Sequence, residues 1–173
     1  MSVKSYLKRC EEFSICSQIG ERAGLVFVEP AVDRMTLYQI AVKGSGRLSS
    51  IFNSEFEVGD ANGINFSSMK HYMGQTTIFE SYEPFHIYGF NTLSKNQDWD
   101  GKLINESFDG DDKSWLICFD GRPVINGVEL ARMDYAKLEN KHYDVDIKDG
   151  LVGVFTKFCL LYTSPSPRDK RQS

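Results

Sequence analysis

His86 and Tyr88 are the clearest candidates for acid–base chemistry in this sequence. They stand two residues apart in the apolar segment 85–90. If that segment is a strand, alternate residues share a face, so both side chains point to the same side. An imidazole exchanges protons near neutral pH and a phenol can serve as the acid, so the pair predicts a catalytic proton-transfer site. The competing explanation is that both side chains point outward or cap a polar contact in the core.

Carboxylates and guanidinium groups near the pair could bind a ligand. Glu80 and Glu83 could act as a base or orient the histidine, and Arg34, Arg47 and Arg122 could hold an anion through bidentate contacts. In a chain with 24 acidic and 20 basic residues, solvated carboxylates and surface salt bridges are the alternative. We predict Glu80 and Arg47 as ligand-binding residues.

Several well-known catalytic motifs are absent from the sequence. There is no P-loop, no dinucleotide-binding glycine fingerprint, no nucleophile elbow and no zincin histidine pair. P-loop hydrolysis, Rossmann redox chemistry and zincin chemistry therefore lack support, and we expect no cofactor.

The four cysteines do not suggest a metal or disulfide framework. Cys10, Cys16, Cys118 and Cys159 form no C-x-x-C pair and match no zinc spacing. Without a secretory signal, disulfides are not expected. Cys118 lies inside an apolar run, where it is predicted to be a small core residue.

The elements that would position these residues are short apolar segments separated by turn residues, a pattern typical of a β-sandwich or barrel. Glycine turns separate many of them, and Asn126-Gly127 between two apolar runs predicts a two-residue hairpin. The predicted strands span residues 13–19, 24–28, 36–42, 47–52, 64–67, 76–81, 85–90, 115–119, 123–125, 128–130, 135–138, 143–147 and 151–158.

Three segments depart from this pattern. Residues 1–12 predict a short N-terminal helix. Residues 91–114 are polar and rich in turn residues, which predicts a long loop that packs partly as a lid.

Residues 159–173 carry two Ser-Pro pairs and no periodicity, so they predict a disordered tail. The tail also resembles translated adapter sequence at the ends of environmental shotgun reads, which suggests a non-native end and a metagenomic source. Residues 1–158 are predicted to form a single domain.

Composition and charge limit the partners. The chain has 173 residues, a net charge of −4 and twelve Phe, eight Tyr and two Trp, an aromatic content that favours strands. The acidic balance argues against a nucleic-acid partner. No run of about 18 apolar residues is present, so we expect no membrane span and a cytoplasmic location.

Two stretches repeat one order of features. In residues 38–48 a strand ends at a glycine turn and a hairpin partner follows, with Gly59-Asp60 further along the chain. Residues 116–130 show the same order of strand, glycine turn and hairpin partner, with Met133-Asp134 after them. Two β-rich units of about seventy residues would each leave a face uncovered, so we expect them to pair into one core.

These stretches resemble the cupin superfamily over residues 24–157. Val42-Lys-Gly-Ser-Gly-Arg-Leu48 with Val58-Gly-Asp60 is similar to the first cupin hairpin and its Gly-Asp step. The run from Phe119 to Leu130, with Met133-Asp-Tyr-Ala-Lys-Leu138, is similar to the same step elsewhere in the superfamily. The resemblance implies an antiparallel double-stranded β-helix, or jelly roll, with a ligand pocket inside the barrel.

The resemblance also bears on the three histidines. Metal-binding cupins carry His-x-His and a Glu before the first hairpin, whereas residues 28–34 contain no histidine. His71 lies about where a second-motif cupin histidine would, and we predict it as a ligand-binding residue; His142 lies near the equivalent place after Asp134. If a metal binds, its ligands would be His71, His86 and His142, but the pattern speaks against a metal.

These observations leave three functions open. The first is a small-molecule-binding cupin that acts as a metal-independent isomerase or lyase through His86 and Tyr88, as cupin-type sugar-nucleotide epimerases use such a pair. The second is a non-enzymatic β-sandwich with a ligand-binding, regulatory or viral structural role. The third is a metal-dependent cupin. Exposed sheet edges favour a homodimer in each case.

Overall fold

The computed structural model describes residues 3–21, 26–28, 35–50, 53–58, 64–72, 77–92 and 97–159. All regular structure in these residues is β, so the predicted all-β class is confirmed. The chain divides into two compact units, Met1–Lys95 and Asn96–Ser173. No helix in the described ranges is long and apolar enough to cross a membrane.

The predicted N-terminal helix is wrong. Residues Val3–Arg9 form strand β1, which pairs antiparallel with β2 (Phe13–Gly20) and places Tyr6 opposite Ser17. The backbone amide of Cys10 donates to the carbonyl of Phe13 and closes the turn between the strands. Pairing along a whole neighbouring strand outweighs the weak helical preference of so short a segment.

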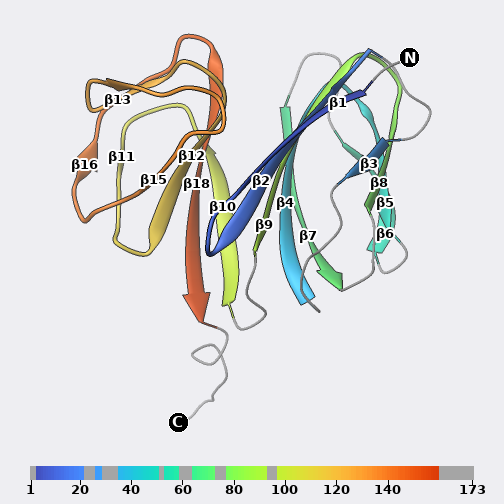
Figure 1. Cartoon of the computed structure of the whole chain (residues 1–173), viewed down its shortest axis with the longest axis horizontal. Helices are drawn as coiled ribbons and strands as arrows, with labels where there is room; N and C mark the ends of the chain where they lie inside the picture. The colour runs from blue at the N-terminus through green and yellow to red at the C-terminus, as the bar shows by residue number, and fades with distance from the viewer. Residues whose placement is uncertain are drawn as a thin grey trace. The chain divides into compact units, whose positions relative to one another are not determined.

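The first unit contains two antiparallel sheets (Figure 1). One has the order β1-β2-β9-β4-β7, with β9 at Phe85–Thr92, β4 at Met35–Lys43 and β7 at Ile64–Tyr72. The other has the order β3-β8-β5-β6, with strands at Val26–Val28, Thr77–Ser81, Gly46–Ser50 and Asn53–Val58.

The two sheets of the first unit pack through one apolar cluster. Phe79 from the smaller sheet contacts Phe85 from the larger one, with ring centroids 5.7 Å apart. The alternation of side chains along each strand places every second residue in this cluster. Its buried members are Cys16, Ile40, Val42, Leu48, Phe79, Phe85 and Ile87.

The second unit is built on a sheet with the order β10-β18-β12-β15, at Gln97–Ile104, Gly150–Cys159, Ser114–Gly121 and Tyr135–Lys137. Two smaller sheets complete it: β11 (Phe108–Asp109) with β16 (His142–Tyr143), and β13 (Val124–Ile125) between β14 (Val128–Glu129) and β17 (Val145–Asp146). Its core cluster contains Leu116, Ile125, Leu138, Tyr143, Val152 and Val154.

The predicted hairpin at Asn126-Gly127 is confirmed, whereas the predicted loop 91–114 is wrong over much of its length. Asn126 and Gly127 have φ values of 49° and 78° and join the paired strands β13 and β14. Residues 97–104 instead form β10, whose whole length pairs with β18 and buries Trp99. Its partner strand lies far away in the sequence, so local composition gave no sign of it.

The jelly-roll prediction is confirmed as an all-β, antiparallel arrangement, but the described strands form open sheets and no closed barrel. In the first unit, the larger sheet ends at β1 and β7 and the smaller one at β3 and β6. Residues 160–173, which make up most of the predicted tail, lie outside the described residues, as does Arg34. The single-domain prediction stays a prediction.

Candidate functional site

His86 lies between two hydroxyl groups. Its Nδ1 is 2.7 Å from the hydroxyl oxygen of Tyr88, and its Nε2 is 2.5 Å from the hydroxyl oxygen of Ser17. The imidazole also stacks against the Tyr88 ring, with centroids 3.9 Å apart. The predicted pair is therefore in direct contact, and Ser17 extends it to a chain of three groups.

The strand register explains this arrangement. Ser17 of β2 and Tyr88 of β9 are direct partners across the ladder, and His86 comes two residues before Tyr88. Direct partners and residues two apart share one face of a sheet, so all three side chains point to the same side.

The chain of three groups suits a residue that changes protonation state. In neutral imidazole one nitrogen donates and the other accepts, whereas in the imidazolium both donate. A hydroxyl can rotate to donate or accept, so Ser17 and Tyr88 can satisfy His86 in either form. The geometry is therefore compatible with general acid–base chemistry at His86.

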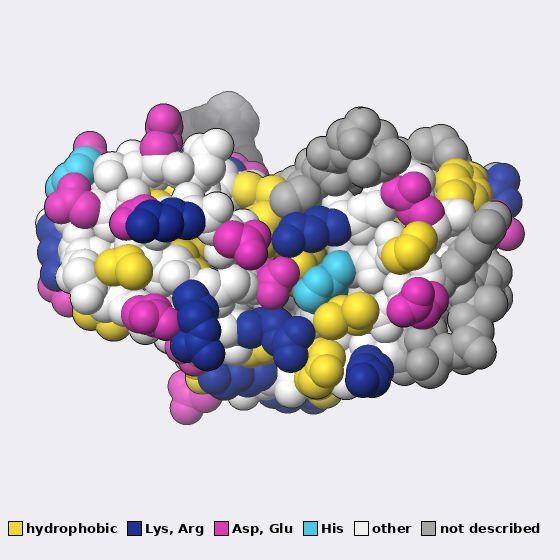
Figure 2. Space-filling view, turned by 90° about the horizontal axis from the view of Figure 1, so that it is seen from above, with side chains coloured by type: hydrophobic (Ala, Val, Ile, Leu, Met, Phe, Trp, Pro, Cys, Tyr) yellow, Lys and Arg dark blue, Asp and Glu magenta, His cyan; other side chains and the backbone are white. Residues whose placement is uncertain are grey.

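His86 also lines a surface pocket of the first unit, of about 500 Å³. The pocket lies where β2, β9 and β4 end, and it opens to solvent. Side chains of both charges reach it, and Figure 2 shows such a mixture of basic, acidic and histidine side chains at the surface. The lining residues are Lys4, Ile19, Gly20, Glu21, Lys43, Gly44, Glu83, Pro84, Phe85 and His86.

His86 faces away from the apolar cluster of its own unit. Its sequence neighbours Phe85 and Ile87 both belong to that cluster, so His86 and Tyr88 lie on the opposite face of the sheet. The cupin resemblance placed the ligand inside the barrel. The pocket at His86 instead lies at the end of the other face of the sheet.

Exposure differs sharply within the chain of three groups. Ser17 and Tyr88 are 0% exposed, whereas His86 is only partly buried. A ligand in the pocket would therefore contact the imidazole, and the two buried hydroxyls would act only through their hydrogen bonds to it.

The structure does not bring Arg47 and Glu80 to this pocket. They are direct partners on β5 and β8 and form an ion pair of 2.5 Å, with both side chains about two fifths exposed. Their neighbours Leu48 and Phe79 point into the apolar cluster, so Arg47 and Glu80 lie on the outer face of the smaller sheet. Glu83, by contrast, does line the pocket.

His71 and His86 occupy distant positions in the larger sheet. The backbone of His71 on β7 pairs with Thr36, near one end of β4, whereas His86 pairs with Lys43 at the other end. The side chain of His71 lies outside the described residues. Among the side chains that the structure describes, no three His, Cys, Asp or Glu residues gather as a group that could hold a metal ion.

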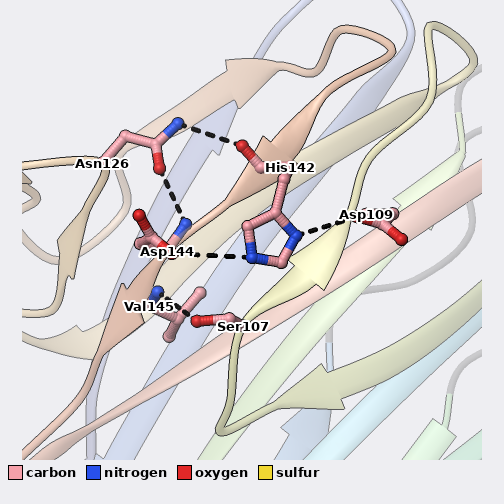
Figure 3. A network of polar contacts seen from close by, with 6 residues as sticks. All are labelled: Ser107, Asp109, Asn126, His142, Asp144 and Val145. Carbon is pink, nitrogen blue, oxygen red and sulfur yellow. Dashed lines mark hydrogen bonds and ion pairs between the residues drawn. The ribbon is translucent and has the colours of Figure 1, made fainter.

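His142 belongs to a separate polar network in the second unit (Figure 3). Its Nδ1 is 2.8 Å from Asp109 on the paired strand β11, and its Nε2 is 3.5 Å from Asp144. The hydrogen bond that His142 donates to Asp109 is the main cause of a raised His142 pKa. Asn126 fixes the same segment through the backbone amide of Asp144 and the carbonyl of His142.

Cys118 is not a candidate nucleophile. The side chain is fully buried, which confirms the prediction that it is a core residue. Burial raises the pKa of its thiol to about 11, so the reactive thiolate is scarce at neutral pH.

Four polar residues of the site were not predicted from the sequence: Ser17, Lys4, Lys43 and Glu21. Ser17 is an ordinary strand serine whose role depends on the pairing of β2 with β9. Lys4 lies in residues 1–12, for which the sequence predicts a helix. Only the register of the four strands β1, β2, β9 and β4 identifies Ser17 and the two lysines.

No family model matches the sequence, and no curated protein sequence matches it either. Solved structures do match. A conserved protein of unknown function from Pseudomonas aeruginosa PAO1 is 9% identical with a TM-score of 0.61, over 91% of this chain and 89% of that one. HutD from Pseudomonas fluorescens SBW25 is 8% identical with a TM-score of 0.53, over 85% and 79% of the two chains. Oxalate decarboxylase from Bacillus subtilis is 8% identical with a TM-score of 0.53, over 94% and 77%.

HutD and oxalate decarboxylase are cupin-domain structures, so the matches support the fold that the resemblance to cupins implied. At such low identity the likeness shows the fold alone, and fold does not determine activity. The chain is thus cupin-like in fold, and its function has to be argued from its own site.

Proposed function

We propose that this cupin-like protein binds a small molecule in the His86 pocket and transfers a proton there as an isomerase or lyase without a metal. The observation that carries the proposal is the contact between Tyr88 and His86, whose imidazole also lines a pocket of about 500 Å³. A pocket of this volume is typical of small-molecule sites.

In this proposal His86 is the acid–base residue and the two hydroxyls are positioning residues. Both ring nitrogens of His86 face hydroxyls, Tyr88 at Nδ1 and Ser17 at Nε2. For proton transfer the Ser17 side chain turns away from Nε2, which then accepts a proton from a carbon next to a carbonyl or carboxylate, and the electron pair of the C–H bond moves onto that group. The imidazolium returns the proton to the same or a neighbouring atom in an isomerase, or to the leaving group in a lyase. Nδ1 donates to Tyr88 in both protonation states, so this hydrogen bond is kept throughout.

Histidine-ring NMR tests whether the ligand binds at His86. The purified protein is titrated with a panel of small carboxylates, sugars, nucleotide sugars and amino acids, with ring resonances assigned from H86Q and H142Q. We expect at least one compound to shift the His86 resonance and leave that of His142 in place. Absence of any His86 shift across the panel, or shifts confined to His142, would contradict the proposal.

The burial of the two hydroxyls favours a second function, a non-catalytic ligand-binding module. Ser17 and Tyr88 are 0% exposed, so a ligand can contact only the edge of the imidazole unless the strands move. Binding at His86 without proton exchange between ligand and solvent would support this alternative over the isomerase or lyase.

A further inference from the structure

We propose that the ligand of the His86 pocket is a small zwitterion that carries both a carboxylate and an ammonium group, as an amino acid does. This inference rests on the proposed function of the same pocket and adds the class of ligand. It follows from the charges that line the pocket and from their positions on the strands.

The cationic side of the pocket is set by one row of the sheet. Lys4 on β1 is opposite Ile19 on β2, Ile19 is opposite His86 on β9, and His86 is opposite Lys43 on β4. Direct partners share a face, so the two lysines lie on either side of His86 on the same face. This row can bind a carboxylate next to the imidazole.

The acidic side comes from the bends beyond the strand ends. Glu21 follows Gly20, the last residue of β2, and Glu83 lies in the turn between β8 and β9. Both line the pocket with the two lysines. The positive charges are therefore on the strands, and the negative charges are on the bends beyond them.

Equal numbers of lysines and glutamates distinguish a zwitterion from a simple ion. The lysines would attract a ligand with a carboxylate alone, but the two glutamates would repel it. The glutamates would attract a ligand with an amine alone, but the two lysines would repel it. Charged groups that lose water need a partner in exchange, so a ligand with both charges fits the lining best.

Two glycines in the pocket lining allow close packing against Phe85 and Pro84. A Cβ at Gly20 would lie 2.5 Å from the Phe85 ring, and one at Gly44 would lie 2.6 Å from the carbonyl of Pro84. Gly44 also has a φ of 94°, which disfavours any other residue. The backbone therefore approaches Phe85 and Pro84 closely here, and Ile19, Pro84 and Phe85 complete the pocket lining beside the charged residues and His86.

Isothermal titration calorimetry with matched ligands tests the inference. The intact protein is titrated with the standard amino acids and, for any that binds, with the matching acid lacking the amine and the matching amine lacking the carboxylate. We expect an amino acid to bind and each matched compound to bind at least about tenfold more weakly, as expected for the loss of one charged contact.

Charge variants connect the binding to named residues. K4Q, K43Q, E21Q and E83Q should each weaken amino-acid binding by up to about fivefold, the range for partly exposed charge pairs. K8Q is the matched control, because Lys8 is on the same strand and face as Lys4 but does not line the pocket. It should bind as the unchanged protein does.

The outcomes separate the inference from the proposed function. If the acid without an amine binds as tightly as the amino acid and still shifts the His86 resonance, the zwitterion is wrong and the proposed site stands. If K4Q, K43Q, E21Q and E83Q change the free energy of unfolding but leave amino-acid binding unchanged, the four charges stabilise the fold and the inference is overturned. If no amino acid binds, the inference is also overturned.

Discussion

The hydroxyl oxygen of Tyr88 lies 2.7 Å from Nδ1 of His86, two residues earlier on the same strand. The contact depends on strand geometry, because residues two apart on β9 share one face. It joins a fully buried side chain to one that reaches a solvent-open pocket. Several consequences of this arrangement and of the surrounding fold can be measured.

Removing the Tyr88 hydroxyl should alter His86 directly. In Y88F the ring contact remains but Nδ1 loses its partner, so the ¹⁵N shifts of the His86 nitrogens should change. The free energy of unfolding should fall by about 1 kcal/mol, typical for one hydrogen bond. The control is Y135F, a tyrosine of the second unit whose ring packs against Trp115; it should leave the His86 nitrogens unchanged. Unaltered His86 shifts in Y88F would show that the contact does not persist in solution.

Two serines on β2 offer a matched comparison of stability. Ser14 and Ser17 are both buried, but Ser17 is hydrogen-bonded to His86, whereas the Ser14 hydroxyl has no hydrogen-bond partner among the residues that the structure describes. S17A should lower the free energy of unfolding by about 1 kcal/mol, because it leaves Nε2 without its partner. S14A should stay within about 0.5 kcal/mol of the unchanged protein. Urea unfolding of both variants measures the difference, and equal losses would argue against the Ser17 contact.

His142 should titrate above its ordinary range because of Asp109. The pKa of His142 is raised mainly by the hydrogen bond that its ring donates to that carboxylate. The stabilisation from this contact is fully present below the pKa of the unfolded chain and is lost as the pH rises through the higher folded-state pKa. D109N should lower the His142 pKa in an NMR titration, and D144N should lower it less because that ion pair is longer, at 3.5 Å. A larger fall in the His142 pKa in D144N than in D109N would contradict this prediction.

Two glycines of the second unit should differ in their tolerance of alanine. Both have left-handed backbones, with φ of 79° at Gly121 and 78° at Gly127. A Cβ at Gly127 would meet no atom within 4 Å, so G127A should lose only the backbone preference, about 1 kcal/mol. A Cβ at Gly121 would overlap the carbonyl of Asp149, so G121A should lose at least about twice as much. Chemical unfolding gives both values, and similar losses would contradict the turn geometry.

Strand positions could be predicted from the sequence where local signals are strong. Apolar segments bounded by glycine turns gave most of the strands, and Asn126-Gly127 gave its hairpin. The errors at β1 and β10 both concern polar strands that are held by a partner strand. The partner of β10 is the distant β18, which a short window of sequence does not contain, whereas β1 is held by the adjacent β2 despite its weak local strand signal.

The candidate site could be predicted only in part for the same reason. His86 and Tyr88 share one strand, so period-two alternation was sufficient to place them together. Ser17, Lys4 and Lys43 come from three other strands, and only the register of the sheet brings them to His86. Residue type alone favours Arg47 and Glu80 as ligand-binding residues, whereas in the structure they pair with each other on the smaller sheet.

Deuterium exchange tests the central claim, that His86 transfers a proton, most directly. The protein is incubated in D₂O with the compound that shifts the His86 resonance, and loss of the ligand C–H signal is followed by ¹H NMR. We expect exchange in the unchanged protein and in H142Q, and a loss of about 100-fold or more in H86Q, the usual contribution of a general acid–base residue. Exchange in H86Q at the rate of the unchanged protein would contradict the claim.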